Sequence, residues 1–316
     1  MRARINTGPL FAFTILTPTY NRAHLLSRVY DSLRAQTFRD FEWIIVDDGS
    51  TDGTRELVAA WASEANFPIR YFWQAHRHKK TAFNRGVREA SGELFLCWDS
   101  DDSAPPDALE IFWRHWNAIP ENERQQFVGV TGLCVDEDKK IIGDRFPDHP
   151  FDSDDLSMRF RYGVRGEKWG VHRVDLLRLY PYPESVEGFV PESVVWNALA
   201  RRYKTRFVNE VVRVYHREED SLCNATKTRK KLRSIAHGTV YAASEFLDRD
   251  IKWIFWSPWE VFKIAANFVR FSLHLRNSKY KATCKLTSTA GKTLVAVAWP
   301  VGLLAYAHDE LSLPEE

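Results

Sequence analysis

The chain reads GELFLCWDSDD from Gly92 to Asp102. Within it, Leu94–Trp98 is a short run of apolar and aromatic residues, which is typical of a buried β-strand. Three carboxylates follow at once, at Asp99, Asp101 and Asp102. This stretch therefore predicts a strand that delivers acidic side chains to one edge of a sheet.

Similar apolar runs precede this stretch, and helical patterns separate them. The strand runs are Phe11–Leu16, Glu42–Val46 and Ile69–Trp73, and the helical patterns are His24–Ala35, Asp52–Ala65 and Thr81–Ala90. Strands that alternate with helices imply right-handed β-α-β units and parallel pairing. We therefore expect an α/β fold.

Polar residues follow the ends of three expected strands, at Thr17–Asn21, Asp47–Asp52 and Asp99–Asp102. Ligands bind beyond the carboxyl ends of the strands in such sheets, so we expect a site there. Clustered carboxylates repel one another unless a cation neutralises them, and their hard oxygen atoms suit Mg²⁺ or Mn²⁺. The cationic run His76–Lys80 enters a helix at the same edge and would complete a pocket for a diphosphate.

Each of these features also has a purely structural interpretation. Asp102 suits the positive end of the following helix, Asp47–Asp52 could be a turn with a helix cap, and His76–Lys80 could be a solvated charged run. Asp99 and Asp101 lie too far upstream to stabilise that helix. Their position favours the ligand-binding interpretation.

Several blocks of sequence occur in the order and at the spacing of a known family. They are Pro18–Arg22, Gln36–Phe38, Val46–Thr54, His78–Val87, Ala90–Leu94 and Trp98–Asp102, with Pro106 at the usual distance. In these blocks the chain resembles family 2 glycosyltransferases of the GT-A fold, over about residues 10–220. The resemblance implies a mixed sheet flanked by helices, and an inverting transfer of a sugar from a nucleotide donor.

The resemblance also implies roles for residues on the donor side. Asp48, with the loop that holds Thr17, Pro18 and Tyr20, would bind the uracil and ribose of a nucleotide-sugar. Asp99 would approach the ribose, and Asp101 would bind Mn²⁺ or Mg²⁺ on the diphosphate. The expected donor site is completed by residues of the same blocks, namely Lys79, Asn84 and Ser100.

An inverting transferase needs a base that deprotonates the acceptor hydroxyl. The family usually supplies the aspartate of a Glu-Asp pair that begins a helix, and here Pro191-Glu192 stands at that place. Glu192 is therefore the expected base, although it could simply stabilise its helix. His216 is expected to complete the metal or phosphate shell, as a late histidine does in some relatives. Lys168 and Trp169 are placed on the acceptor side, with a core position for Trp169 as the alternative.

The net charge of +2 is distributed unevenly. Residues 1–220 carry −4, residues 221–292 carry +10 from 14 basic and 4 acidic residues, and residues 293–316 carry −4. We expect a catalytic domain at 1–220 and a basic, aromatic-rich helical extension at 221–316. A basic segment favours an anionic partner. Because no nucleic-acid recognition motif is present, a membrane surface is expected and nucleic acid is not.

The extension carries apolar helical patterns. Ser257-Pro258-Trp259-Glu260 is a capping box, and the helix after it is apolar over most of its circumference, as in buried or interfacial helices. The run Leu294–Ala307 has 14 residues, fewer than the roughly 20 that a spanning helix needs. Contact with a membrane interface is therefore expected, and packing onto the catalytic domain is the alternative.

Four widely spaced cysteines and an N-terminus without a cleavage site favour a reducing, cytoplasmic location. The sequence thus predicts a metal-dependent inverting transferase that moves a sugar from a UDP-sugar to a hydroxyl of a glycan or glycolipid. The alternative is a non-catalytic nucleotide-sugar-binding or membrane scaffold protein, which only Pro191 favours.

Overall fold

The computed structural model describes residues 8–216, 228–276 and 285–315, which form two compact units. The first unit comprises the chain to Asp155, Val164–Pro181 and Leu199–His216. The second comprises Leu156–Gly163, Tyr182–Ala198 and the chain after His216. The predicted boundary between residues 220 and 221 lies outside the described residues. Two internal segments of the chain group with the C-terminal helices. A division of the sequence at a single boundary therefore does not describe the two units.

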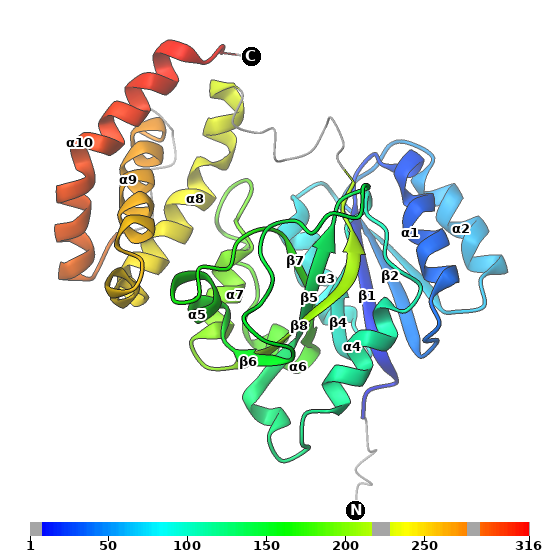
Figure 1. Ribbon diagram of the computed structural model, residues 1–316. Helices are drawn as coiled ribbons and strands as arrows, with labels where there is room; N and C mark the ends of the chain where they lie inside the picture. Colours follow the sequence, from blue (N-terminus) through cyan, green and yellow to red (C-terminus); the bar gives the residue numbers. More distant parts are fainter. Residues whose placement is uncertain (1–7, 217–227, 277–284, 316) are drawn as a thin grey trace, which may run out of the picture. The chain divides into compact units, whose positions relative to one another are not determined.

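In the described residues, the first unit is built on one mixed sheet of eight strands in the order β3-β2-β1-β4-β7-β5-β8-β6 (Figure 1). Strands β1 to β4 pair in parallel, β7 is antiparallel to β4 and β5, and β6 is antiparallel to β8. The strands are β1 (Phe11–Thr19), β2 (Phe41–Asp47), β3 (Ile69–Trp73), β4 (Gly92–Cys97), β5 (Phe127–Val135), β6 (Phe151–Ser153), β7 (Lys168–Arg173) and β8 (Lys204–Val214).

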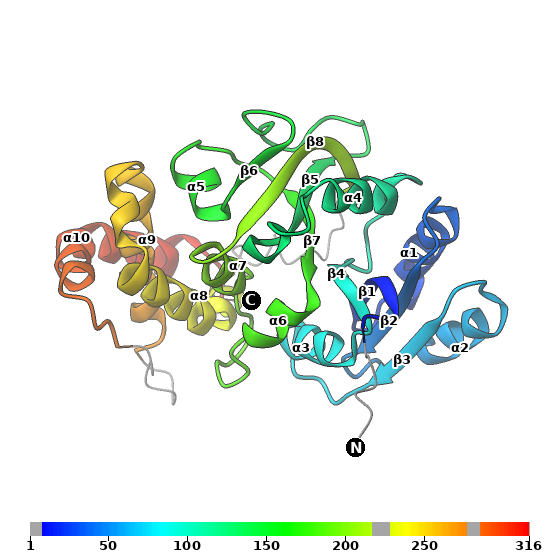
Figure 2. The same cartoon turned by 90° about the horizontal axis from the view of Figure 1, so that it is seen from below.

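Helices cover both faces of this sheet (Figure 2). One face carries α1 (Ala23–Ala35), α2 (Thr54–Glu64) and α4 (Ala108–Asn117), and the other carries α3 (Lys79–Glu89) and α6 (Val174–Leu179). The predicted α/β class, a mixed sheet flanked by helices, is confirmed.

The core on the α1–α2–α4 face is rich in aromatic rings, such as Tyr30 and Trp61, whose stacked centroids lie 4.5 Å apart. On the opposite face, α3 approaches β1 closely because Gly86 has no side chain. A Cβ atom at Gly86 would lie 2.6 Å from Cδ1 of Leu16. This packing fixes the N-terminus of α3, and with it Lys79, near the rim of the sheet.

The structure differs from the sequence-based prediction mainly after β4. The sequence pattern predicts strands at Lys140–Ile142, Arg206–Val208 and Val211–Tyr215 and a helix at Pro191–Tyr203. Residues 140–142 form a single bridge, Val135 to Ile141, and one bulged strand, β8, takes the place of the other two. Helix α7 (Ser193–Ala200) is shorter than the predicted helix. Elements not predicted include β6, β7, α6, η1 (Arg124–Gln126) and α5 (Asp155–Phe160).

The second unit contains α8 (Arg229–Arg249), η3 (Ile251–Phe255), α9 (Pro258–His274) and α10 (Thr289–Ser312), besides most of α7. Helices α9 and α10 lie side by side. Gly302 permits this approach, since a Cβ atom there would lie 2.5 Å from Cβ of Val269. Asp309 of α10 accepts hydrogen bonds from Arg270, at 2.6 and 2.7 Å, and from His274 at 3.0 Å. These contacts give the extension a buried polar clamp, which its sequence pattern did not predict.

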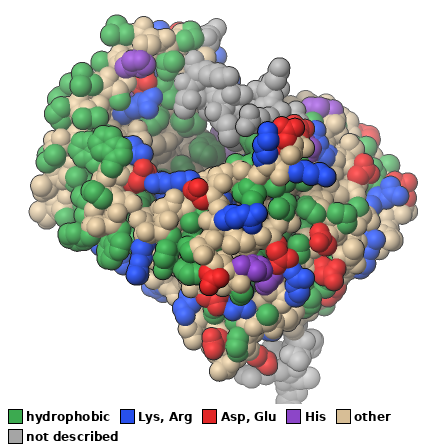
Figure 3. Space-filling view, viewed as in Figure 1, with side chains coloured by type: hydrophobic (Ala, Val, Ile, Leu, Met, Phe, Trp, Pro, Cys, Tyr) green, Lys and Arg blue, Asp and Glu red, His purple; other side chains and the backbone are tan. Residues whose placement is uncertain are grey.

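Helix α10 has 24 residues and is the one helix in the described ranges that is long and apolar enough, by length and composition, to cross a membrane. The expectation that this segment is too short therefore does not hold, because the helix extends beyond the apolar run at both ends. Only 17% of its apolar window is buried. Figure 3 shows hydrophobic side chains over the region of α9 and α10. Large exposed side chains on α10 are Val297, Trp299, Val301, Leu304 and Leu311.

Candidate active site

The loops after β1 and β2 are fastened to each other at the rim of the sheet. Asn21, in the left-handed region with φ of 52°, accepts a hydrogen bond from the Thr51 amide at 2.8 Å. Its own amide donates to Oγ of Ser50 at 2.8 Å. The amide of Ala23 donates to Asp52 at 3.0 Å. The first two of the three predicted polar clusters therefore meet, as expected for the ends of parallel strands.

Asp48 lies at the base of this rim and is 3% exposed. Its carboxylate accepts hydrogen bonds from Nε2 of Gln74 at 2.7 Å and from the amide of Arg77 at 3.0 Å, and it lies 2.9 Å from Nδ1 of His76. Gly49 has φ of 94°, and a Cβ atom there would lie 3.0 Å from the amide nitrogen of His76. Tyr20 stacks on His76 with centroids 4.2 Å apart. The cationic run thus folds over Asp48 and leaves an exposed aromatic ring beside it.

Asp99 connects the β4 loop to α3. Its Oδ1 lies 2.7 Å from Nζ of Lys79, and its Oδ2 lies 3.4 Å from Nη2 of Arg213. Burial alone would raise the pKa of Asp99, but the ammonium of Lys79 and the guanidinium of Arg213 outweigh it and hold that pKa below its ordinary value. Asp99 is therefore an anion that already binds cationic groups.

Asp101 and Ser100 connect the β4 loop to α1. Nη1 of Arg22 lies 2.7 Å from Oδ2 of Asp101 and 3.4 Å from Oγ of Ser100. Arg28, further along α1, donates to the backbone carbonyl of Asp101. The loop that carries the predicted metal ligand is thus held by Arg28 of α1 and by Arg22, the residue that precedes this helix.

Asp102 differs from its neighbours because it is 1% exposed and pairs with Arg213 of β8. Burial raises the pKa of Asp102 to about 7, with Asp99 and Asp101 adding to the rise and Arg213 opposing it. Arg213 also lies with its guanidinium carbon 5.8 Å from the ring centroid of Trp169. Arg213 was not predicted as a site residue. A single charged residue within an apolar run of β8 is nevertheless a signal that could have identified it.

His216 follows β8 and touches the same loop. Its amide donates to Oδ1 of Asp102 at 3.2 Å, its Nδ1 lies 2.8 Å from Oε1 of Glu137, and its Nε2 lies 2.9 Å from Oγ of Ser103. In the neutral ring Nδ1 donates to the Glu137 carboxylate, and Nε2 accepts from the Ser103 hydroxyl. A metal ion bound at Nε2 would take the place of this hydroxyl.

The residues at Asp99 and Asp101 fit a divalent metal ion. Both are carboxylates at a strand end, Asp99 is held in its ionised form, and each already contacts a cationic side chain that stands in for a metal. The predicted Mn²⁺ or Mg²⁺ is therefore compatible with the rim.

Three predicted donor-site residues lie beneath the rim. Thr17 is fully buried and its hydroxyl accepts a hydrogen bond from Nε1 of Trp43 at 2.9 Å. Pro18 pairs with Val46 inside the sheet, and Asn84 is 4% exposed on α3. These positions indicate that the three side chains support the rim from below.

Trp169 takes the core position that was its alternative, and the acceptor-side role of Lys168 stays a prediction. Trp169 is 6% exposed, donates from Nε1 to the carbonyl of Cys97 at 2.8 Å, and packs edge-on against Trp98. Nζ of Lys168 donates to the carbonyls of Ile142 and Arg165. Both residues belong to β7, a central strand that the sequence did not predict, and this placement buries the tryptophan.

Glu192 immediately precedes α7 and belongs to the second unit, whereas the rim belongs to the first. Its role as base stays a prediction.

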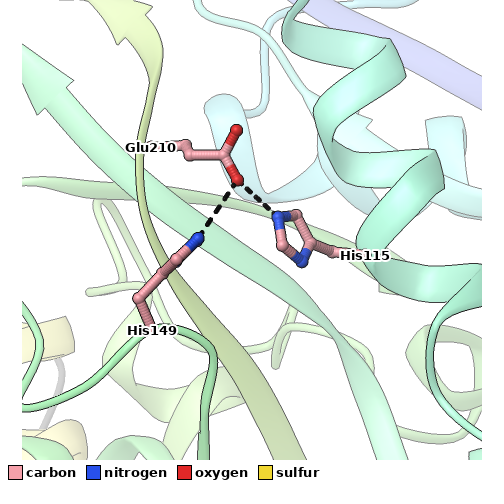
Figure 4. A group of neighbouring side chains, drawn as sticks. All are labelled: His115, His149 and Glu210. Atoms are coloured by element: carbon pink, nitrogen blue, oxygen red, sulfur yellow. Dashed lines mark hydrogen bonds and ion pairs between the residues drawn. The ribbon is translucent and has the colours of Figure 1, made fainter.

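One other group of potential metal ligands occurs in the described ranges, formed by His115, His149 and Glu210 (Figure 4). Their ligand atoms lie within 4.8 Å of one another. The amide of Asn209, however, donates to Nδ1 of His149 at 3.1 Å, so the proton of the neutral ring is on Nε2, which faces Glu210. A metal would need that lone pair, so we interpret the group as a hydrogen-bonded clasp between α4, β8 and the loop before β6.

A mixed sheet with carboxylates at the ends of β2 and β4, facing a cationic helix start, defines the GT-A class of glycosyltransferase. Residues 14–168, just under half of the chain, match the family described as Glycosyl transferase family 2. The predicted resemblance is confirmed.

Among its relatives, the chain is 25% identical over 221 residues to the GalNAc(5)-diNAcBac-PP-undecaprenol beta-1,3-glucosyltransferase of Campylobacter jejuni, which covers 68% of each protein. It spans only 21–30% of the length of three other curated relatives, which it matches at 31–38% identity.

Solved structures share the fold. TarS of S. aureus in complex with UDP-GlcNAc has a TM-score of 0.56 and 18% identity, covering 93% of this chain and 81% of that chain. The mannosyltransferase PcManGT of Pyrobaculum calidifontis, with GDP-Man and Mn²⁺, has a TM-score of 0.54 and 18% identity, covering 97% and 90%.

Proposed function

We propose that this protein transfers a sugar from a nucleotide-sugar, with inversion at the anomeric carbon, to a hydroxyl group of a glycan or a lipid-linked glycan. The observation that carries the proposal is the rim itself. Asp48 contacts His76, on which the exposed ring of Tyr20 stacks, and Lys79 and Asp99 form an ion pair. Such a rim offers acceptors for the base and ribose and cations for the diphosphate.

The donor is a UDP-sugar in this proposal, and the similar fold of TarS, which was solved with UDP-GlcNAc, supports that choice. Asp48 would accept hydrogen bonds from the base, and Asp99 from the ribose. Lys79 would pass from Asp99 to a diphosphate oxygen, which stabilises the negative charge that develops on the leaving group.

Mn²⁺ or Mg²⁺ would be held by Asp101, with His216 as a second ligand, and would neutralise charge on the departing diphosphate. The tautomer that Glu137 imposes on His216 supports this role. The Mn²⁺ in the complex of PcManGT gives a precedent in the same fold.

Glu192 would accept the proton of the attacking hydroxyl. In an inverting transfer the hydroxyl oxygen forms the new bond to the anomeric carbon while the bond to the nucleoside diphosphate breaks. The Glu192 carboxylate takes the proton, and the diphosphate leaves with the electron pair.

We also propose a peripheral location on the cytoplasmic face of a membrane, with anionic lipid as partner. The exposed apolar residues of α10 and the basic residues of the same segment support this location. The undecaprenol-linked substrate in the name of the Campylobacter relative supports a lipid-linked acceptor.

The test is release of the nucleoside diphosphate from UDP-, GDP- and dTDP-sugars, with and without Mn²⁺, in the presence of lipid-linked glycan acceptors. We expect the Asp101→Asn variant to lose metal-dependent turnover. The matched control is Asp138→Asn, which removes a carboxylate that is 77% exposed on a turn. Equal turnover by the wild type and Asp101→Asn would refute the proposal.

A Glu192→Gln variant separates the enzyme from a non-catalytic binding protein. A transferase that uses Glu192 as its base loses turnover and keeps its donor affinity. Unchanged turnover together with unchanged donor affinity would show that Glu192 only stabilises its helix.

A further inference from the structure

The position of Arg22 is fixed by the loops that surround it. It is the residue that precedes α1, between Asn21, which binds the Ser50–Thr51 turn, and Ala23, whose amide binds Asp52. Its backbone therefore moves only if both loops of the donor rim move. A side chain whose backbone is held in this way is preorganised to contact one partner.

That target is the predicted metal ligand. Nη1 of Arg22 lies 2.7 Å from Oδ2 of Asp101, and the side chains are 26% and 17% exposed, respectively. A half-buried, charge-assisted contact of this length is stronger than a solvent-exposed ion pair. Arg28 holds the backbone carbonyl of Asp101 at the same time, so the carboxylate cannot turn away freely.

The guanidinium of Arg22 and a divalent ion are both cations, so they repel each other and compete for the carboxylate of Asp101. A metal ion that binds alone meets this repulsion, and it must displace Arg22 to bind Oδ2 with full access. A bound diphosphate changes the balance, since its oxygens offer Arg22 a new anionic partner within the same rim.

We infer that Arg22 is a resident counter-ion of Asp101, which holds the metal position closed until a nucleoside diphosphate draws the guanidinium away. This inference rests on the proposed function of the rim. Arg22 then acts twice, once by keeping the Asp101 carboxylate in place, and once by binding the diphosphate. Metal binding and donor binding are coupled through it, and neither reaches full affinity alone.

The experiment measures calorimetric binding of Mn²⁺ alone, and of UDP with and without Mn²⁺, to the wild type and to Arg22→Gln. We expect Arg22→Gln to bind Mn²⁺ alone about tenfold more tightly than the wild type does, since a hydrogen bond to a charged group is removed from the competing state. The same variant should bind UDP in the presence of Mn²⁺ about tenfold more weakly.

Two further variants make the result specific. Arg22→Lys keeps the charge and should return both affinities toward the wild-type values. Arg39→Gln removes an exposed arginine that donates to the Arg34 carbonyl, and it should change neither affinity. A merely structural role for Arg22 would weaken both ligands together, so the opposite signs are the decisive readout.

The outcomes separate the inference from the proposed function. Wild-type protein that binds UDP with Mn²⁺, together with an Arg22→Gln variant that binds Mn²⁺ alone no more tightly, overturns the counter-ion role and leaves the proposed function intact. Wild-type protein that binds neither UDP nor Mn²⁺ overturns both.

Discussion

Asp99, Asp101 and Asp102 stand within four positions of one another, yet each meets a different cation. Lys79 pairs with Asp99, Arg22 with Asp101 and Arg213 with Asp102. The mutual repulsion that the sequence implied is thus relieved by side chains from three other elements. Asp102, the most deeply buried of the three, is the one that serves the fold.

Arg213 and Asp102 form a buried pair, and breaking it from one side leaves a charge without its partner. We expect Arg213→Gln to lower the free energy of unfolding by about 3 kcal/mol. The double variant Arg213→Gln/Asp102→Asn should recover part of this loss, because it also removes the stranded carboxylate. Urea unfolding of the single and double variants gives the coupling energy, and strictly additive effects would contradict the pairing.

The residue types at the rim were predictable, but their partners were not. Asp48, Lys79 and Asp99 follow apolar strand runs or begin a helix, so their common edge follows from the alternation of strands and helices. The pairing of Arg213 with Asp102 joins residues more than a hundred positions apart. It depends on β8 lying beside β5, which no local pattern shows.

At the scale of elements, β7 explains the largest error. It inserts antiparallel between β4 and β5, and its buried residues are Trp169 and Val171. Its six residues, Lys168–Arg173, include two basic side chains, a histidine and a glycine, and therefore lack the apolar run by which the other strands were found. Trp169 lies in the core, which was the alternative to its expected place on the acceptor side.

Helix α9 shows a smaller difference of the same kind. The helix begins at Pro258, as its sequence predicted, with Ser257 before it. The hydroxyl of Ser257 does not cap the helix and donates to the carbonyl of Phe160 at 2.8 Å. The capping signal in the sequence thus located the start of the helix correctly. The Ser257 hydroxyl, however, forms a longer-range contact instead of capping the helix.

His172 of β7 gives the first unit a pH-dependent stability. Burial lowers the pKa of His172 from 6.5 to about 4. The unfolded chain therefore binds a proton before the folded one does, and stability is complete above pH 6.5 and falls as the pH drops toward 4. The loss of unfolding free energy that is attributable to His172 is at most about 3 kcal/mol.

We expect His172→Gln to flatten the decline of melting temperature between pH 7 and pH 4.5. His308→Gln, which removes an exposed histidine of α10, is the control. If the melting temperatures of the wild type and of the two variants decline in parallel, the imidazole of His172 is charged in the folded state.

The clasp formed by His115, His149 and Glu210 joins α4, β8 and the loop before β6. Glu210 accepts from Arg114 and His115, which lower the pKa of Glu210 against the effect of burial. We expect Glu210→Gln to cost about 1–2 kcal/mol of stability. Thermal unfolding with and without Zn²⁺ checks the interpretation, because a clasp is indifferent to the ion. A rise in melting temperature with Zn²⁺ that the variant lacks would make the group a metal site.

At the scale of the whole molecule, the second unit combines a polar clamp inside with apolar side chains outside. Asp309, Arg270 and His274 fasten α9 to α10, so the exposed leucine and valine side chains of α10 are presented on a packed helix pair. The charge asymmetry of the sequence indicated a separate segment, and α9 and the apolar part of α10 could be predicted from their apolar patterns, whereas α8 was not predicted. The grouping of α7 with this unit could not be predicted, since it depends on contacts between residues that are far apart in the sequence.

If α10 contacts lipid, acidic residues on its exposed face should release it. We expect the wild type to sediment with vesicles that contain anionic lipid, and Val297→Asp/Leu304→Asp to bind at least about tenfold more weakly, from the lost apolar burial of two side chains. Leu179→Asp changes an equally exposed leucine of the first unit, 71% against 69% for Leu304, and should leave binding unchanged. Equal sedimentation of all three proteins would contradict the membrane contact.

The most direct test of the central claim is the equilibrium binding of UDP to the rim, measured by calorimetry with and without Mn²⁺, for the wild type and for Asp101→Asn. The proposed site predicts saturable binding by the wild type that Mn²⁺ strengthens by tenfold or more, on the order of one charge-assisted contact, and loss of that enhancement in Asp101→Asn. UDP binding that is equal with and without Mn²⁺, and equal in the two proteins, would contradict a metal-assisted nucleotide-sugar site at Asp101.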